Sequence, residues 1–161
     1  MAFVIPSSFI SRLRSLITAV ALIIGAGALT TSCGDNDFND LPREIQQFIS
    51  QYFPGQGVAD FSESGGTYTV NLDNSASFVF NSSLIWTTID GNGSPIPRQL
   101  VFDQFPSKLY DYIETTDNLG EVYSVTRDAG IYMVTFHGYI ISYNVSTGDI
   151  QPVVTGSGAN G

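Results

Sequence analysis

The residues that could support catalysis are few. His137 is the only histidine and Cys33 the only cysteine in the 161-residue chain, so a His- or Cys-rich metal site is excluded. No serine has a lysine three positions later, and none lies in a G-x-S-x-G pattern, so the two commonest serine-nucleophile motifs are absent. We therefore expect no cofactor. We interpret His137, which precedes Gly138, as a residue of a hairpin turn.

The 15 acidic residues are the remaining candidates for chemistry. Two carboxylates that converge in one pocket could serve a hydrolase, and the sequence leaves this alternative open. Almost all of the acidic residues, however, fall in expected turns or on expected helix surfaces. Asp35, Asp37 and Asn39 alternate like the start of a calcium loop, but Asp40 occupies the position that needs glycine. We therefore expect no metal and no enzyme activity.

Cys33 is expected to carry a lipid. Two arginines precede an apolar run of 14 residues, Leu16–Leu29. The run is too short for a bilayer about 30 Å thick but typical of a signal peptide. Small residues then lead directly to the cysteine, as in a bacterial lipobox, although Thr30 occupies the usual leucine position. The sequence predicts a signal peptide at residues 1–32, cleavage before Cys33, and membrane attachment through its lipidated sulfur.

Residues 33–40 are predicted to form an acidic tether. All 15 acidic residues but only four of the six basic ones follow Cys33, so this part of the chain has a net charge of −11. Such a charge repels nucleic-acid phosphates, and we exclude nucleic acid as a partner. The acidic residues directly after the cysteine resemble a surface-export signal of Bacteroidetes lipoproteins. An outer-membrane lipoprotein that faces the periplasm or the cell surface is therefore expected.

Two helices are expected because one apolar pattern occurs twice. The segment Leu41–Phe53 has apolar residues at i, i+4, i+7, i+8 and i+11, which form one face of a helix. The segment from Phe105 repeats these offsets 64 residues later. Pro42 and Pro106 occupy the second position of the two segments, where the first turn of a helix tolerates a missing N–H. The repeat matches Ile45 with Leu109 and Phe48 with Tyr112.

Four strands are expected after each helix. Apolar and polar residues alternate, most clearly in Thr67–Asp73, which indicates a sheet with one covered face. Gly65-Gly66 and His137-Gly138 are suited to tight turns. Residues 98–104 are expected to bridge the two units. The expected strands are 58–62, 67–73, 77–81 and 85–89, then 121–127, 131–137, 139–144 and 150–154.

These elements predict an α+β fold with two tandem repeats. Each repeat is a helix packed on a four-stranded antiparallel sheet, at about 41–95 and 96–154. A unit of this size is marginal alone, so we expect one domain, 41–154, in which the units share a continuous sheet. A flexible tail is expected at 155–161.

The sheet face opposite the helices is the expected binding surface. Some of its positions, including Met133, are more apolar than a solvent-exposed face requires. Trp86, the only tryptophan, joins this face if its side chain points outward. In the alternative it fills the core against the first helix. The candidate partner-binding residues are Trp86, Thr67, Thr69, Asn71, Met133 and Thr135.

Several of these segments together resemble a known family. The chain is similar to the PepSY-like family of Bacteroidetes exported proteins. The similarity is carried by LPREIQQFISQYFPGQGV, the paired strands after it, W-x-x-I-D-G at Trp86–Gly91, and Ile96-Pro97 before the second helix. Those proteins are described as similar to beta-lactamase inhibitory proteins. The resemblance covers Leu41–Ile150 and is weaker in the second repeat, where Asn118-Leu119-Gly120 replaces the Pro-Gly helix stop.

The resemblance implies two repeats with a curved sheet whose concave side can hold a protein. In the inhibitory proteins an acidic hairpin tip enters the active site of the enzyme, and Asp73 lies at a comparable hairpin. We expect a lipid-anchored, non-enzymatic binding module of the cell envelope that engages a protein or peptide, with inhibition as one form. The alternatives are a carboxylate-dependent envelope hydrolase or accessory, and a structural envelope protein without a discrete ligand.

Overall fold

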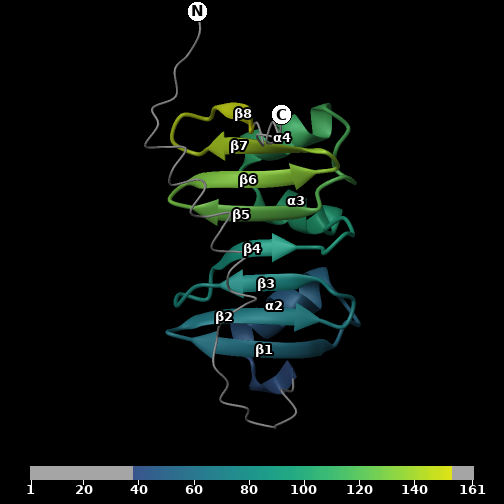
Figure 1. Ribbon diagram of the computed structural model, residues 1–161, viewed down its shortest axis with the longest axis vertical. Coiled ribbons are helices and arrows are strands. Elements are labelled where there is room, and N and C mark those ends of the chain that lie inside the picture. Colours follow the sequence, from purple (N-terminus) through teal and green to yellow (C-terminus); the bar gives the residue numbers. More distant parts are fainter. Residues whose placement is uncertain (1–37, 154–161) are drawn as a thin grey trace, which may run out of the picture. The chain divides into compact units, whose positions relative to one another are not determined.

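The computed structural model describes residues 38–153. The predicted signal peptide, Cys33 and the predicted tail lie outside the described residues. The described part is α+β, with three α-helices on one side of an eight-stranded antiparallel sheet (Figure 1). The last three residues of the predicted tether form a 3₁₀-helix. The elements are η1 (Phe38–Asp40), α2 (Arg43–Tyr52), β1 (Val58–Ser64), β2 (Thr67–Leu72), β3 (Ser77–Phe80), β4 (Trp86–Asp90), α3 (Arg98–Gln104), α4 (Ser107–Thr115), β5 (Ser124–Asp128), β6 (Ile131–Phe136), β7 (Tyr139–Asn144) and β8 (Ile150–Val153).

The order of strands in the sheet is the order of strands in the chain, from β1 to β8. Each of the eight strands overlaps its predicted range, although β5 begins at Ser124, three residues later than predicted. The strands form the continuous sheet that was expected. Paired residues of most neighbouring strands are at most 14 positions apart in sequence. Paired residues of β4 and β5 are 34 to 38 positions apart, because α3 and α4 lie between these strands. Only three residue pairs join β4 to β5.

Helices α2 and α4 lie in the two segments where the apolar pattern predicted helices, but their prolines lie one position earlier than predicted. Pro42 and Pro106 are the N-cap residues and have extended ψ angles of 144° and 137°. Their carbonyl groups accept the first helical hydrogen bonds, from the N–H groups of Gln46 and Tyr110 at 3.1 and 3.0 Å. A proline suits this position because its own missing N–H would have no helical partner.

Residues 98–104 form a helix, α3, and not only a bridge. Pro97 is its N-cap residue, and Phe105 follows it in an extended conformation before Pro106. The helix buries Leu100 and Val101. The two prolines limit it to seven residues, which is too short for a clear helical period.

The core lies between the three helices and the sheet. Ile45 and Ile49 of α2, and Leu109 and Ile113 of α4, are at most 1% exposed. Phe48 and Tyr112 are partly buried against this core. The ring of Phe48 makes edge contacts with Phe78 and Phe80 of β3. Edge-to-face aromatic pairs of this kind add to the stabilisation that comes from burial.

Candidate functional site

No helix of the described residues covers the sheet face opposite α2, α3 and α4, and Figure 1 looks directly onto it. We call it the open face. The strand register aligns one residue from each of the eight strands in a row across this face. All eight are uncharged, and five carry a hydroxyl group. This neutral row consists of Ser62, Thr69, Val79, Thr88, Thr126, Met133, Ser142 and Gln151.

A second row runs beside the neutral row. It includes the carboxylates of Asp60 and Asp90, and the side-chain amide of Asn71 donates a hydrogen bond to Asp60 at 2.7 Å. At the β7–β8 end the row becomes apolar, with Ile140 opposite Val153. The flanking row, as we call it, consists of Asp60, Asn71, Ser77, Asp90, Ser124, Thr135, Ile140 and Val153.

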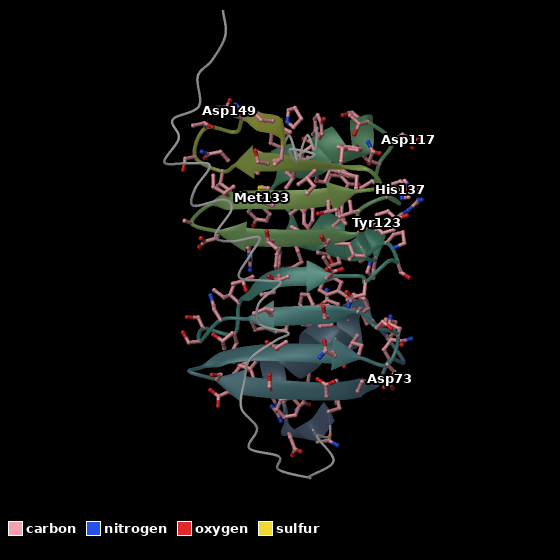
Figure 2. The ribbon with its side chains drawn as sticks, viewed as in Figure 1. Asp73, Asp117, Tyr123, Met133, His137 and Asp149 are labelled. Atoms are coloured by element: carbon pink, nitrogen blue, oxygen red, sulfur yellow. The ribbon has the colours of Figure 1, made fainter. Side chains whose placement is uncertain are left out.

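Most of the residues predicted for the binding face lie on it. Thr69 and Met133 belong to the neutral row, and Asn71 and Thr135 to the flanking row. Thr67 is exposed at the first position of β2. Figure 2 shows Met133 on β6, with Tyr123 and His137 at one end of the strands.

These residues do not form one compact patch. Four strand-to-strand steps separate Thr69 from Met133, or about 19 Å at roughly 4.8 Å per step. Thr88 and Thr126 lie between them and are paired with each other. Sequence reasoning missed both threonines, although the alternation of β4 and β5 could have indicated them.

The prediction that Trp86 belongs to the binding face is wrong. Its side chain is 3% exposed and lies on the helix-covered side. Val79 is paired with Thr88, but Phe80 is paired with Trp86, so Thr87 is an extra residue in β4. This β-bulge shifts the alternation of side chains by one residue. Trp86 therefore shares the side of Phe80, and the alternative expectation of a core position is the one observed.

Gln104 of α3 connects Trp86 to α2. The indole N–H of Trp86 donates to Gln104 Oε1 at 2.9 Å. Gln104 Nε2 in turn donates to the Tyr52 hydroxyl at 2.8 Å. Burial raises the pKa of the Tyr52 hydroxyl, the bond from Gln104 opposes this shift, and nearby Asp103 adds to it. The hydroxyl is therefore protonated at neutral pH, and it holds this polar chain inside the protein.

Arg127 of β5 covers the other side of Trp86. The centre of its guanidinium group lies 3.8 Å from the centroid of the indole ring, within the range of a cation–π interaction. Its Nε–H donates to the carbonyl oxygen of Trp86 at 2.6 Å. Nη1 donates a longer bond, 3.4 Å, to the Tyr132 hydroxyl. Arg127 is partly buried.

A pocket of about 300 Å³ opens beside Arg127. It lies where three hairpin turns meet, β3–β4, β5–β6 and β7–β8. The N–H of Val145 donates to the carbonyl oxygen of Gly130 at 2.9 Å and joins two of these turns. We call this hollow the strand-end pocket. Its walls include Ile85, Trp86, Arg127, Asp128, Tyr132 and Val145.

Asp73 lies in the turn between β2 and β3, at the opposite ends of the strands from this pocket (Figure 2). The residue is exposed. Its carboxylate is turned back onto Gly57, where an added Cβ would collide with Oδ2. Its N–H donates to the carbonyl oxygen of the same glycine at 3.0 Å. The predicted hairpin tip is thus accessible but folded against the loop before β1.

His137 is exposed in the two-residue turn between β6 and β7, as predicted. Its ring lies 6.1 Å from that of Tyr123. Among residues 38–153, no group of three His, Cys, Asp or Glu side chains is arranged to hold a metal ion. No helix within this same part of the chain is long and apolar enough to span a membrane.

Comparison with known proteins finds similarity at the level of structure. No family model and no curated protein matches the chain. A Bacteroides vulgatus protein of the DUF2874 family, assigned to the periplasm, superposes with a TM-score of 0.58 at 23% identity, covering 75% of this chain and 97% of that one. A second B. vulgatus protein assigned to the periplasm, of unknown function, gives 0.60 at 22% identity, with coverages of 73% and 95%.

A third similar structure comes from Bacteroides thetaiotaomicron. It is described as a candidate calcium-regulated periplasmic protein and gives a TM-score of 0.57 at 22% identity, covering 71% of this chain and 92% of that one. At these identities the similarity shows a shared fold. The fold of this chain is therefore that of a group of Bacteroides proteins assigned to the periplasm.

Proposed function

We propose that this protein is a lipid-anchored, non-enzymatic binding module of the cell envelope. In this proposal it is PepSY-like, is built from two tandem repeats, and engages a protein or peptide through the open face. Inhibition of an enzyme is one form that such binding can take. The observation that supports the proposal best is the neutral row across all eight strands.

The composition of the neutral row is unusual for a surface without a partner. Solvent-exposed positions are mostly polar and often charged, and this chain has 15 acidic residues. None of them is in the neutral row. Charged residues are depleted in the centres of protein interfaces, and short hydroxyl side chains can donate or accept hydrogen bonds. The row therefore shares the absence of charge with an interface centre, and it can form hydrogen bonds with a partner.

The flanking row suggests the chemistry of the partner. Asp60 and Asp90 lie beside the neutral row, and the chain after Cys33 has a net charge of −11. Electrostatic complementarity favours a partner with basic groups around a neutral contact area. We therefore expect a protein or peptide with a basic rim.

Fold similarity supports the proposed location, and the order of elements in the chain supports the proposed repeats. The similar structures are assigned to the periplasm, which agrees with an exported envelope protein. The order of a helix followed by four strands occurs twice in the chain, as a duplicated unit requires. The carboxylate hydrolase gains no comparable support, because Asp128 is the only carboxylate that lines the strand-end pocket.

A charge placed in the neutral row tests the proposal. Met133→Lys introduces an ammonium group in the middle of the proposed interface, where it must be desolvated on binding. We expect partner capture to fall at least tenfold, while the free energy of unfolding changes by about 0.5 kcal/mol or less. Capture is measured with tagged full-length protein extracted from membranes, followed by quantitative mass spectrometry.

The matched control is Gln99→Lys, which makes the same charge change at an exposed position of α3 on the opposite side of the sheet. Capture by this variant should equal that of the unaltered protein. If Met133→Lys captures the same proteins in the same amounts, the open face is not the binding surface.

A further inference from the structure

The strand-end pocket exists because β4 and β5 separate at one end. Their register stops at Thr88 and Thr126, so Trp86 and Thr87 have no paired residues on β5. The side chain of Arg127 fills part of this gap, where its Nε–H bonds the carbonyl oxygen of Trp86. A side chain thus replaces a backbone hydrogen bond of the sheet.

Arg127 retains donors that no described residue uses. A guanidinium group has five N–H donors, and its two hydrogen bonds, to Trp86 and Tyr132, use two of them. No carboxylate within residues 38–153 forms an ion pair with it. No buried side-chain nitrogen of the described residues lacks a hydrogen-bond partner. Nη2 takes part in neither hydrogen bond and is therefore accessible, and Arg127 lines the strand-end pocket.

The entrance of the pocket is apolar. Ile85 and Val145 are two of the four large hydrophobic side chains that are exposed in the described part of the chain, at 49% and 47%. Both line the pocket, with Trp86 and Tyr132 deeper inside. Leu84, which precedes Ile85, has a φ of 58°, an uncommon conformation for a bulky residue. Polar side chains also line the pocket, from Asn81, Thr87, Arg127 and Asp128. Apolar walls with a few polar groups are typical of a ligand site.

We propose that the strand-end pocket binds a carboxylate attached to a small apolar group, as in the C-terminal residue of a peptide. Arg127 pairs with the carboxylate through its free N–H groups, which suit the two carboxylate oxygens. Ile85, Val145 and the edge of Trp86 contact the apolar group. A volume of about 300 Å³ limits the bound part to one or two residues. This site lies at the strand ends and borders the open face at Asp128, but it does not depend on the function proposed for that face.

Asp128 also lines the pocket and opposes this binding. Its carboxylate is exposed, so water and salt screen its repulsion, over about 8 Å at physiological ionic strength. Arg127 is partly buried, where screening is weaker and its attraction stronger. We therefore expect the arginine to determine which ligand binds, and Asp128 to reduce the affinity only modestly.

The test compares two probes of nearly equal size, one with a carboxylate and one with an uncharged carboxamide in its place. N-acetyl-L-leucine carries the carboxylate, and N-acetyl-L-leucinamide is its uncharged counterpart. Trp86 is the only tryptophan, so its single indole N–H resonance in a proton–nitrogen correlation spectrum reports on the pocket. We expect the acid to shift this resonance saturably and the amide to bind at least tenfold more weakly. No saturable shift, or equal binding of the two probes, overturns the proposal.

Single substitutions test which side chains bind the acid probe. Arg127→Gln should reduce acid binding at least tenfold, and Arg127→Lys should reduce it less, because charge remains but two-point pairing is lost. Arg98→Gln makes the same charge change at an exposed site outside the pocket and should leave binding unchanged. Asp128→Asn should raise acid affinity about twofold. Equal losses of acid affinity in Arg98→Gln and Arg127→Gln would contradict the proposed site. A lower acid affinity in Asp128→Asn would also contradict it. The two-probe comparison needs no variant, so it stands even if Arg127→Gln unfolds.

Discussion

Gln104 is the residue that holds three elements together. The indole N–H of Trp86 can only donate, so the carboxamide oxygen of Gln104 must face it and the amide nitrogen must face Tyr52. Both bonds have good lengths, 2.9 and 2.8 Å. The side chain therefore fits in one orientation only, and it links β4 to α2 through α3.

Replacement of Gln104 by leucine should destabilise the fold. The leucine has a similar size, but it leaves the buried N–H of Trp86 without an acceptor, which costs about 1–3 kcal/mol. Chemical denaturation measures this difference as a shift in the midpoint. Gln99→Leu, at an exposed position of the same helix, is the control and should change stability by about 0.5 kcal/mol or less. Equal stability of the two variants would mean that the hydrogen-bonded chain contributes nothing.

Trp86 shows where residue-level prediction from sequence fails. The period of two places Trp86 on the same side as Thr88, and it correctly places Met133 and Thr69 on the open face. The bulge at Thr87 inserts one residue and reverses the side for Trp86. No local pattern in the sequence signals this bulge, because it depends on how β4 pairs with β3. Arg127, which covers the indole ring, was for the same reason not foreseen as a site residue.

At the scale of elements, α2 lies behind β2 and β3, and α4 lies behind β7 (Figure 1). Each helix presents fully buried aliphatic side chains to the sheet. Ile45 and Leu109, the matched residues of the two helices, are both 0% exposed. Each helix therefore anchors its own half of the sheet.

Truncation of these anchors should be costly in both halves. Ile45→Ala and Leu109→Ala each remove a fully buried side chain and leave a cavity, and we expect a loss of about 2–5 kcal/mol from each. Urea denaturation gives the two values. Gln47→Ala and Asp111→Ala change exposed positions of the same helices and should have little effect. A loss below about 1 kcal/mol in either anchor variant would show that its helix does not contribute to the core as described.

The elements were largely predictable because they are periodic. The eight strands and the helices α2 and α4 have apolar side chains at regular spacing, which sequence alone reveals. Helix α3 has seven residues and buries only Leu100 and Val101. The sequence therefore contains only two apolar positions from which this helix could be predicted. The polar contacts of its last residue, Gln104, depend on tertiary packing that no short pattern encodes.

At the scale of the whole molecule, the predicted anchor would determine where the proposed binding surfaces act. Cys33 lies five residues before the first described residue, so a lipid on its sulfur would keep the sheet close to a membrane. Cys33→Ser should move the protein from the membrane fraction to a soluble pool, or leave it unprocessed. Fractionation and immunoblotting measure the distribution.

Thr30→Leu, which completes the usual lipobox pattern, serves as the control and should remain in the membrane fraction. A Cys33→Ser protein that fractionates like the unaltered one would contradict lipid attachment.

The open face was predictable as a surface from alternation alone. The strand-end pocket was not, because three hairpin turns that are distant in sequence build it together.

The pairing of β4 with β5 has a consequence for the kinetics of folding. It closes the longest loop between neighbouring strands and uses only three residue pairs, whereas the other pairings are local. Loop closure costs entropy before its contacts form, so the two groups of four strands should condense first and join late. We expect the contacts that join the two groups, among them those of Gln104 with Trp86 and Tyr52, to form after the rate-limiting step. The stability lost in Gln104→Leu should therefore appear mainly as faster unfolding, with the refolding rate nearly unchanged.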